Sequence, residues 1–165
     1  MVKLIQIELE KERFKFSAGH FTVFSAADRE RLHGHNFRVK VHLTLSVIDN
    51  GMSADYKILK DKVQSLCDEL DEYFLIPLKS PYLRVESIAE SGKIEVTHAE
   101  DRMIFYAKDL KLLPLENITI EELAFYFTER FCEDRSLSKE CGIMMVSFGV
   151  SSGDGQFAFY SRSDF

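Results

Sequence analysis

The stretch from His33 to Val47, HGHNFRVKVHLTLSV, contains the most regular pattern in the chain, and the rest of the sequence is interpreted outward from it. From Phe37 onward, apolar residues occupy every odd position and polar residues occupy every even position. This period of two predicts a strand with one face in the core and the other toward solvent. His33 and His35 share the odd parity, so we expect both imidazoles to project from the apolar face.

A second strand is expected just before this stretch. The segment 4–9 alternates with apolar residues at odd positions, whereas from Phe14 to His20 the apolar residues take even positions. Such a change of parity requires an extra residue in the strand, so a bulge or bend is expected near Lys11. On this parity His20 ends the strand on its apolar side. A further pair of strands, on either side of the Gly153-Asp154-Gly155 turn, is expected at the end of the chain.

Two helices and a small insertion complete the predicted elements. The first helix begins after Asp55, a typical N-cap, and its apolar spacing continues to Phe74. The second has a capping box made by Thr119 and Glu122. Between them, residues 79–116 contain three short alternating segments that predict a small β insertion. The whole pattern predicts a single domain over residues 1–165, with an α+β fold and a mainly antiparallel sheet that carries two helices on one face.

Composition excludes several classes of protein. The formal net charge of -6 argues against general binding to nucleic acid or to a membrane surface. The apolar segments are too short to cross a bilayer, and the first residues lack the apolar core of a signal peptide. Three widely spaced cysteines fit a reducing compartment better than a disulfide framework. We therefore expect a cytoplasmic protein with neither nucleic-acid nor membrane partners.

The histidines carry the strongest chemical signal. His33 and His35 start one strand, and His20 ends the preceding one, all on the apolar parity. Three imidazoles that converge from neighbouring strand ends form a three-nitrogen site with an open position, as in catalytic zinc centres. The sequence therefore predicts a Zn²⁺ site at His20, His33 and His35.

The motifs FSAGH at 16–20 and LHGHNF at 32–37 resemble those of the 6-pyruvoyl-tetrahydropterin synthase and 6-carboxy-tetrahydropterin synthase (QueD) family. The resemblance continues at 55–56, 70–71, 117–119 and 122–124, and in the closing strands up to Tyr160. It covers most of the chain apart from the insertion at 79–116.

The resemblance implies a tunnelling fold (T-fold), in which an antiparallel four-stranded sheet is backed by two helices. It also implies a homo-oligomer, commonly a hexamer with barrel-like sheets, whose active sites lie between subunits. In that family the three histidines hold zinc, and the usual substrate is 7,8-dihydroneopterin triphosphate. The products serve tetrahydropterin, queuosine or folate-type biosynthesis.

Three positions depart from the family pattern. The cysteine that acts as base in family synthases is replaced by Arg29. The histidine that follows the aspartate at the end of the first helix is replaced by Glu72, while Asp71 keeps the aspartate. The glutamate that anchors the pterin is replaced by Ser152, although Asp154 is close by in sequence.

One interpretation is that carboxylates replace the missing base. Glu30 or Asp28 would then act near the metal, and Asp71 with Glu72 would move protons. Some relatives use a glutamate near the cysteine position and release 6-hydroxymethyl-dihydropterin. The residues expected to bind the substrate are Ser152, Asp154, Thr119 and Arg29.

The alternative interpretation is a divergent zinc-binding homologue without synthase activity, which binds another pterin-like or purine-like ligand. The replacement of the pterin anchor by Ser152 favours it, because a buried guanidine-like edge binds poorly without a carboxylate partner.

Overall fold

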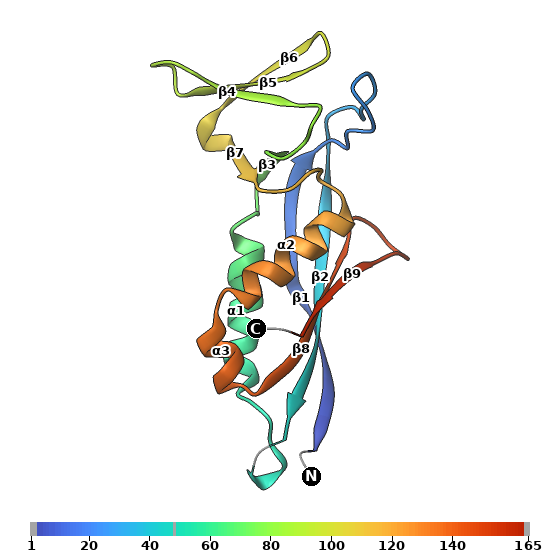
Figure 1. The fold of residues 1–165 in the computed structure, drawn as a ribbon, viewed down its shortest axis with the longest axis vertical. Helices are drawn as coiled ribbons and strands as arrows, with labels where there is room; N and C mark the ends of the chain where they lie inside the picture. The colour runs from blue at the N-terminus through green and yellow to red at the C-terminus, as the bar shows by residue number, and fades with distance from the viewer. Residues whose placement is uncertain (1–2, 48, 164–165) are drawn as a thin grey trace.

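The main sheet of the computed structural model, which describes residues 3–47 and 49–163, has six strands in the order β7-β3-β1-β2-β8-β9 (Figure 1). Four consecutive strands, which end at the β9 edge, are antiparallel as expected: β1 (Leu4–His20), β2 (His33–Ser46), β8 (Ile143–Ser151) and β9 (Ala158–Arg162). Two further strands, β3 (Tyr73–Pro77) and β7 (Leu110–Leu113), extend the sheet beyond β1 and run parallel to it. The prediction of a four-stranded antiparallel sheet is therefore wrong in strand number and in its restriction to antiparallel pairing.

The predicted irregularity in the first strand is confirmed. The pairing of β1 with β2 shifts register between Glu10 and Lys15, which is where the apolar residues change from odd to even positions. After this bulge the register holds to the end of the strand, where His20 pairs with His33. The bulge therefore places His20 on the buried side of the sheet.

Two helices cover one side of the main sheet (Figure 1): α1 (Tyr56–Asp68) and α2 (Ile120–Cys132), with a short α3 (Arg135–Glu140) after them. Both predicted N-caps are confirmed. The Asp55 carboxylate accepts a hydrogen bond from the Lys57 N–H at 2.8 Å, and the Thr119 hydroxyl accepts one from the Glu122 N–H at 3.3 Å.

The first helix ends earlier than its apolar spacing indicates. It stops at Asp68, and Phe74 lies in strand β3. Between them Glu72 adopts a left-handed backbone conformation with φ of 63°, and its N–H donates to the Ser17 carbonyl at 2.8 Å. This hydrogen bond to β1 turns the chain into the sheet, which explains why the helical spacing fails there.

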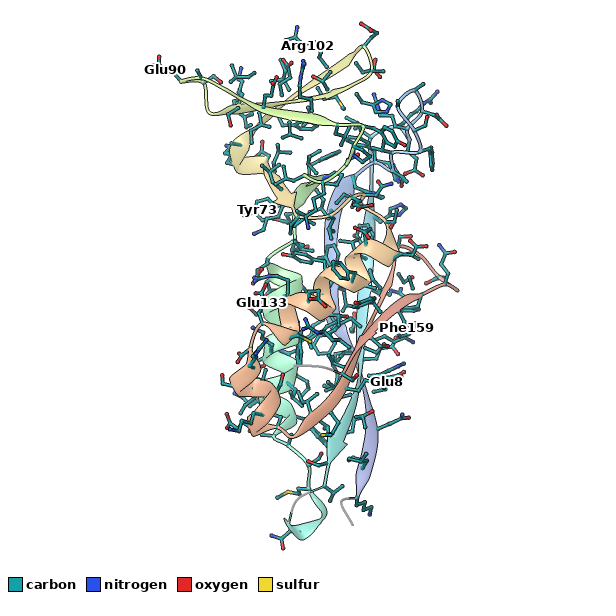
Figure 2. The ribbon with its side chains drawn as sticks, viewed as in Figure 1. Glu8, Tyr73, Glu90, Arg102, Glu133 and Phe159 are labelled. Carbon is teal, nitrogen blue, oxygen red and sulfur yellow. The ribbon has the colours of Figure 1, made fainter. Side chains whose placement is uncertain are left out.

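The three short strands expected within residues 79–116 form a separate antiparallel sheet of β4 (Arg84–Ile88), β5 (Lys93–His98) and β6 (Asp101–Tyr106), whereas β7 joins the main sheet. The separate sheet lies beyond one end of the main sheet, where Figure 2 labels Glu90 and Arg102, and a 3₁₀ turn (Ala107–Asp109) leads from it into β7. A second 3₁₀ turn (Asp49–Gly51) follows β2. The insertion shares an apolar cluster with the main sheet and with the segment after β1; its buried members are Phe21, Val23, Ile76, Ile94, Val96 and Leu110.

The main core lies between the helices and the sheet and is rich in phenylalanine. Burial of apolar side chains such as these rings is the dominant favourable contribution to folding. Cys67 is fully buried there, as expected, and burial raises the pKa of its thiol to about 12. The fully buried phenylalanines of the main core are Phe14, Phe16, Phe37, Phe127, Phe131 and Phe148.

Across the described residues, none of the helices combines the length and the apolar character needed to cross a membrane.

Gly19 allows β3 to pack against β1, so its replacement by alanine is expected to destabilise the fold. A Cβ atom at Gly19 would lie 2.4 Å from the Phe74 ring, which itself packs on Phe21 and Phe105. Forcing that ring to shift is expected to cost about 1–3 kcal/mol in the free energy of unfolding. Urea unfolding of G19A against G153A measures this cost, because a Cβ at Gly153 meets nothing within 4 Å. Equal unfolding midpoints for the two variants would contradict the prediction.

Candidate metal centre

The three predicted ligands come together at one end of the sheet. His20 is the last residue of β1, His33 is the first of β2, and these two residues pair across the strands. His35 lies two residues further along β2 and therefore projects from the same face. One possible ligand atom from each histidine can be chosen so that all three lie within 4.8 Å of one another.

Hydrogen bonds to the backbone fix two of these rings. His20 Nδ1 lies 3.0 Å from the Ile118 carbonyl oxygen, and His33 Nδ1 lies 2.8 Å from the Arg31 carbonyl oxygen. Because a carbonyl can only accept, each Nδ1 carries the hydrogen and each Nε2 presents its lone pair. The backbone thus selects the tautomer that binds a metal through Nε2.

The Nε2 atoms of His20 and His33 offer lone pairs that no backbone hydrogen bond uses. His20 Nε2 is buried and has no hydrogen-bond partner among the residues that the structure describes. His33 Nε2 and His35 Nε2 lie only 3.1 Å apart. Two ligands of a tetrahedral zinc ion with bonds of about 2.0–2.1 Å are about 3.3 Å apart, close to this spacing. The arrangement fits a cation that accepts all three lone pairs.

Burial keeps His20 ready to act as a ligand. The side chain is 5% exposed, and this burial, with the nearby His33 and His35 charges, lowers its pKa to about 4. His20 is therefore neutral near pH 7, and metal binding there displaces no proton from it.

A carboxylate lies beside the histidines. Glu30 Oε2 is 3.9 Å from His33 Nε2 and accepts a hydrogen bond from the Thr22 N–H at 2.9 Å. Burial raises the pKa of Glu30, but hydrogen bonding by Thr22 and the positive charge available on His33 and His20 outweigh it and hold the pKa below its usual value. Glu30 is therefore ionised at neutral pH and can accept a proton.

These groups line a cavity of about 270 Å³. The start of α2, the turn between β8 and β9, and the segment between β1 and β2 contribute to its lining. Thr119 and Ser152, both predicted to bind the substrate, belong to its lining, as does Glu30. Sequence reasoning missed Glu121 and Gln156, which also line the cavity. No spacing in the sequence relates these two residues to the histidines, because each comes from a different element.

The predicted catalytic pair Asp71 and Glu72 does not line this cavity. The Asp71 carboxylate accepts a hydrogen bond from the Ser17 N–H at 2.7 Å, and the side chain borders a groove along β1 and α1. Glu72 borders a separate hollow of about 500 Å³, which His35 also borders. Within one chain, Asp71 and Glu72 therefore border two other hollows and do not line the histidine cavity.

Two of the predicted substrate ligands also lie outside the cavity lining. Arg29 donates to the Asp101 carboxylate at 2.8 Å, so its charge pairs with the insertion. Asp154 is exposed in the turn between β8 and β9 and pairs with Arg38 at 3.1 Å. Asp28, the alternative to Glu30, is exposed in the segment between β1 and β2 and is absent from the cavity lining.

Comparison with solved structures finds the same fold in two malaria parasites. The 6-pyruvoyl tetrahydropterin synthase of Plasmodium vivax superposes with a TM-score of 0.91 at 27% identity, covering 98% of this chain and 99% of that one. The Plasmodium falciparum enzyme gives 0.90 at 29% identity with the same coverage. A further Plasmodium vivax structure, with a TM-score of 0.91 at 26% identity over 98% and 99% of the two chains, is of a variant in which a glutamate described as a catalytic residue is replaced by alanine.

Comparison of sequences leads to the same group of proteins as the comparison of structures. A protein of Methanocaldococcus jannaschii, provisionally named a 6-carboxy-5,6,7,8-tetrahydropterin synthase, is 27% identical over 149 residues, which is 90% of each chain. The profile of the 6-pyruvoyl tetrahydropterin synthase family matches residues 8–162. The resemblance carried by the two histidine motifs is thus confirmed, and the chain belongs to the 6-pyruvoyl tetrahydropterin synthase family.

Proposed function

We propose that this chain is a zinc-dependent lyase that acts on 7,8-dihydroneopterin triphosphate or a closely related pterin. The observation that carries the proposal is the pairing, in one cavity, of three histidine donors with the Glu30 carboxylate 3.9 Å from His33. The relatives named as pterin synthases support the substrate class. The Plasmodium vivax variant supports a glutamate as a catalytic group in at least one of them.

Each group in the cavity has a role in this proposal. Zinc held by the three imidazoles would polarise the hydroxyl groups of the substrate side chain and lower their pKa. Glu30 accepts the proton released from that side chain, and the Thr22 N–H holds its carboxylate in place. Ser152 and Thr119 contact the pterin. Glu121 offers a carboxylate in place of the family glutamate that this chain replaces with Ser152, and it can accept hydrogen bonds from the amino-pyrimidine edge.

The test is to incubate the zinc-loaded protein with 7,8-dihydroneopterin triphosphate and to identify products by chromatography and mass spectrometry. A 6-hydroxymethyl, 6-pyruvoyl or 6-carboxy pterin would establish the lyase and distinguish folate, tetrahydropterin and queuosine chemistry. Unchanged substrate with one zinc ion per chain would overturn the proposal.

A second candidate is a zinc-binding homologue without synthase activity, and the presence of Ser152 in the cavity favours it. Such a protein would bind a pterin-like or purine-like ligand without turnover. Calorimetric titration with non-hydrolysable pterins and with guanine distinguishes this case, because binding would then occur without any product. In either case the cytoplasmic location remains a prediction from composition.

We also propose a homo-oligomer in which Asp71 and Glu72 act in the cavity of a neighbouring subunit. In support, Asp71 is hydrogen-bonded to β1 and borders a groove apart from the histidine cavity of its own chain. A site shared between two copies would use both surfaces.

Mixing two inactive variants is expected to restore activity. H33A would lack the metal, and D71N would lack the ionised carboxylate but keep the hydrogen bond from Ser17. After joint dissociation and reassembly, about one site in four would combine an intact triad with an intact Asp71, so about a quarter of wild-type activity is expected. Each variant reassembled alone is the control. No recovery, with mixed oligomers verified by mass spectrometry, would place both groups in one chain.

A further inference from the structure

The segment that carries Glu30 is held by two contacts to the insertion. Residues 21–32 connect β1 to β2, and a single bridge joins Val23 to Arg29 within them. His98, at the end of β5, is buried and its Nε2 lies 2.8 Å from the Ser25 carbonyl oxygen. Asp101, at the start of β6, accepts from the Arg29 guanidinium at 2.8 Å. The tight turn between β5 and β6 is therefore fastened to this segment from both of its ends.

Arg29 connects the insertion to Glu30 itself. One of its terminal nitrogens donates to Asp101, and the other donates to the Glu30 carbonyl oxygen at 2.9 Å. The guanidinium also lies over the Phe21 ring, 5.4 Å from the ring centroid. Its planar fork can hold both acceptors at once, which a lysine ammonium at the same position could not do in the same geometry.

The environment of this pair differs from that of an ordinary surface ion pair. Exposed pairs are worth little, because both side chains are free to move in water. The Arg29 side chain is only 18% exposed, although that of Asp101 is 65% exposed, and the pair joins residues 72 positions apart in sequence. The apolar cluster beneath it, with Phe21 and Val23 packed beside Val96, limits its movement further.

A base must be fixed within a fraction of an ångström of its working position. The Thr22 N–H fixes the Glu30 carboxylate, but it belongs to the same segment, so it cannot fix that segment relative to the sheet. Asn117 ties Val23 to the chain before α2 on one side. The contacts of His98 and Asp101 provide the second, independent attachment.

We infer that the β4–β6 insertion is a brace for the catalytic segment, and that Asp101 and Arg29 are positioning residues for Glu30. The inference rests on the proposed function for its kinetic consequence. Its structural consequence, the rigidity of residues 22–31, does not depend on that function.

The experiment replaces Asp101 by asparagine, which removes the charge and keeps the shape. We expect D101N to lower kcat roughly tenfold, since small misplacements of a base are costly, with KM changed less than about twofold. The zinc content is expected to stay at the wild-type value, and amide hydrogen exchange at residues 22–31 is expected to accelerate. D101E restores the charge. It is expected to recover most of the lost kcat and most of the slow amide exchange of residues 22–31.

The matched control is E86Q. Glu86 pairs with Arg84 on β4 at 3.2 Å, so this variant breaks an ion pair of the same small sheet without touching residues 21–32. It is expected to leave kcat and the exchange of residues 22–31 unchanged. D101N in an E30Q background is expected to cause no further loss of kcat, because the group that the brace positions is then no longer a base.

The inference is overturned if amide hydrogen exchange at residues 22–31 is as slow in D101N as in the wild type. It is also overturned if the D101N substitution lowers kcat by the same factor in the E30Q background as in the wild type. If the protein turns over no pterin, the proposed function fails, and hydrogen exchange alone decides on the brace. Faster exchange confined to residues 22–31 in D101N, and absent in E86Q, would then still support it.

Discussion

Replacement of His33 by alanine is expected to remove the metal and with it nearly all lyase activity. The His33 Nε2 faces that of His35 at 3.1 Å, and its Nδ1 is held by the Arg31 carbonyl, so this ring is already oriented as a ligand. Loss of a residue that merely orients a ligand costs 10–100-fold in metal affinity, so loss of a ligand itself is expected to cost at least about 100-fold. Elemental analysis after dialysis against a chelator, together with kcat/KM for the purified variant, measures both effects.

His42 provides the matched control for H33A. It lies on the same strand β2, but its side chain is 41% exposed and its Nε2 lies 2.6 Å from the Glu8 carboxylate on β1. H42A is therefore expected to keep one zinc ion per chain and near-wild-type activity. A protein that uses zinc only for structure would respond differently, since H33A would then lower the stability of the oligomer with no turnover to lose. Zinc retained at full occupancy in H33A would refute the site itself.

The metal site is the part of this molecule that the sequence predicts best. Strict alternation in β2 fixes the face of His33 and His35, and the change of parity in β1 fixes the face of His20. Both signals are local, because a strand has a period of two residues whatever it pairs with. The hydrogen bonds that select the tautomers could not be predicted, since one of them comes from Ile118, far along the chain.

The sheet was harder to predict where local patterns compete. Leu70 and Phe74 continue the apolar spacing of α1, so a helix signal overlies the start of β3. The chain leaves the helix because the Glu72 N–H bonds to β1, a tertiary contact with no signature in sequence. β3 and β7 are short strands whose hydrogen-bonding partners in the sheet are parallel neighbours. Because no hairpin turn connects parallel strands, the sequence gives no local signal for such a pairing.

The surroundings of the metal could be predicted only in part. Alternation places Ser152 on the face of Phe37, and the Thr119 N-cap places the start of α2, so both reach the cavity. The sequence predicts that Arg29 binds the substrate, whereas its side chain pairs with Asp101 in the insertion. That partner lies 72 residues away, beyond the range of any spacing argument. Where a side chain points from an irregular segment is a property of the fold and is not encoded locally.

Replacement of Glu30 by glutamine is expected to lower kcat by about 10²–10⁴-fold, the usual contribution of a general base, while zinc remains bound. Glu30 Oε2 lies 3.9 Å from His33 Nε2 and accepts from the Thr22 N–H, and the amide oxygen of glutamine can still accept that hydrogen bond. The variant therefore removes the proton acceptor with little change in shape. Single-turnover kinetics on zinc-loaded protein isolate the chemical step from product release.

Asp28 tests whether the position of the carboxylate matters or only its charge. It lies two residues before Glu30, is exposed, and does not line the histidine cavity. D28N changes the net charge as E30Q does, so any effect on the attraction of an anionic substrate is common to both variants. Activity near the wild-type level in D28N, beside a large loss in E30Q, identifies Glu30 as the base. Equal losses would mean that the charge of this segment acts only on binding, and full activity in E30Q would assign proton transfer to another group, with Asp71 and Glu72 of a neighbouring subunit the next to be replaced.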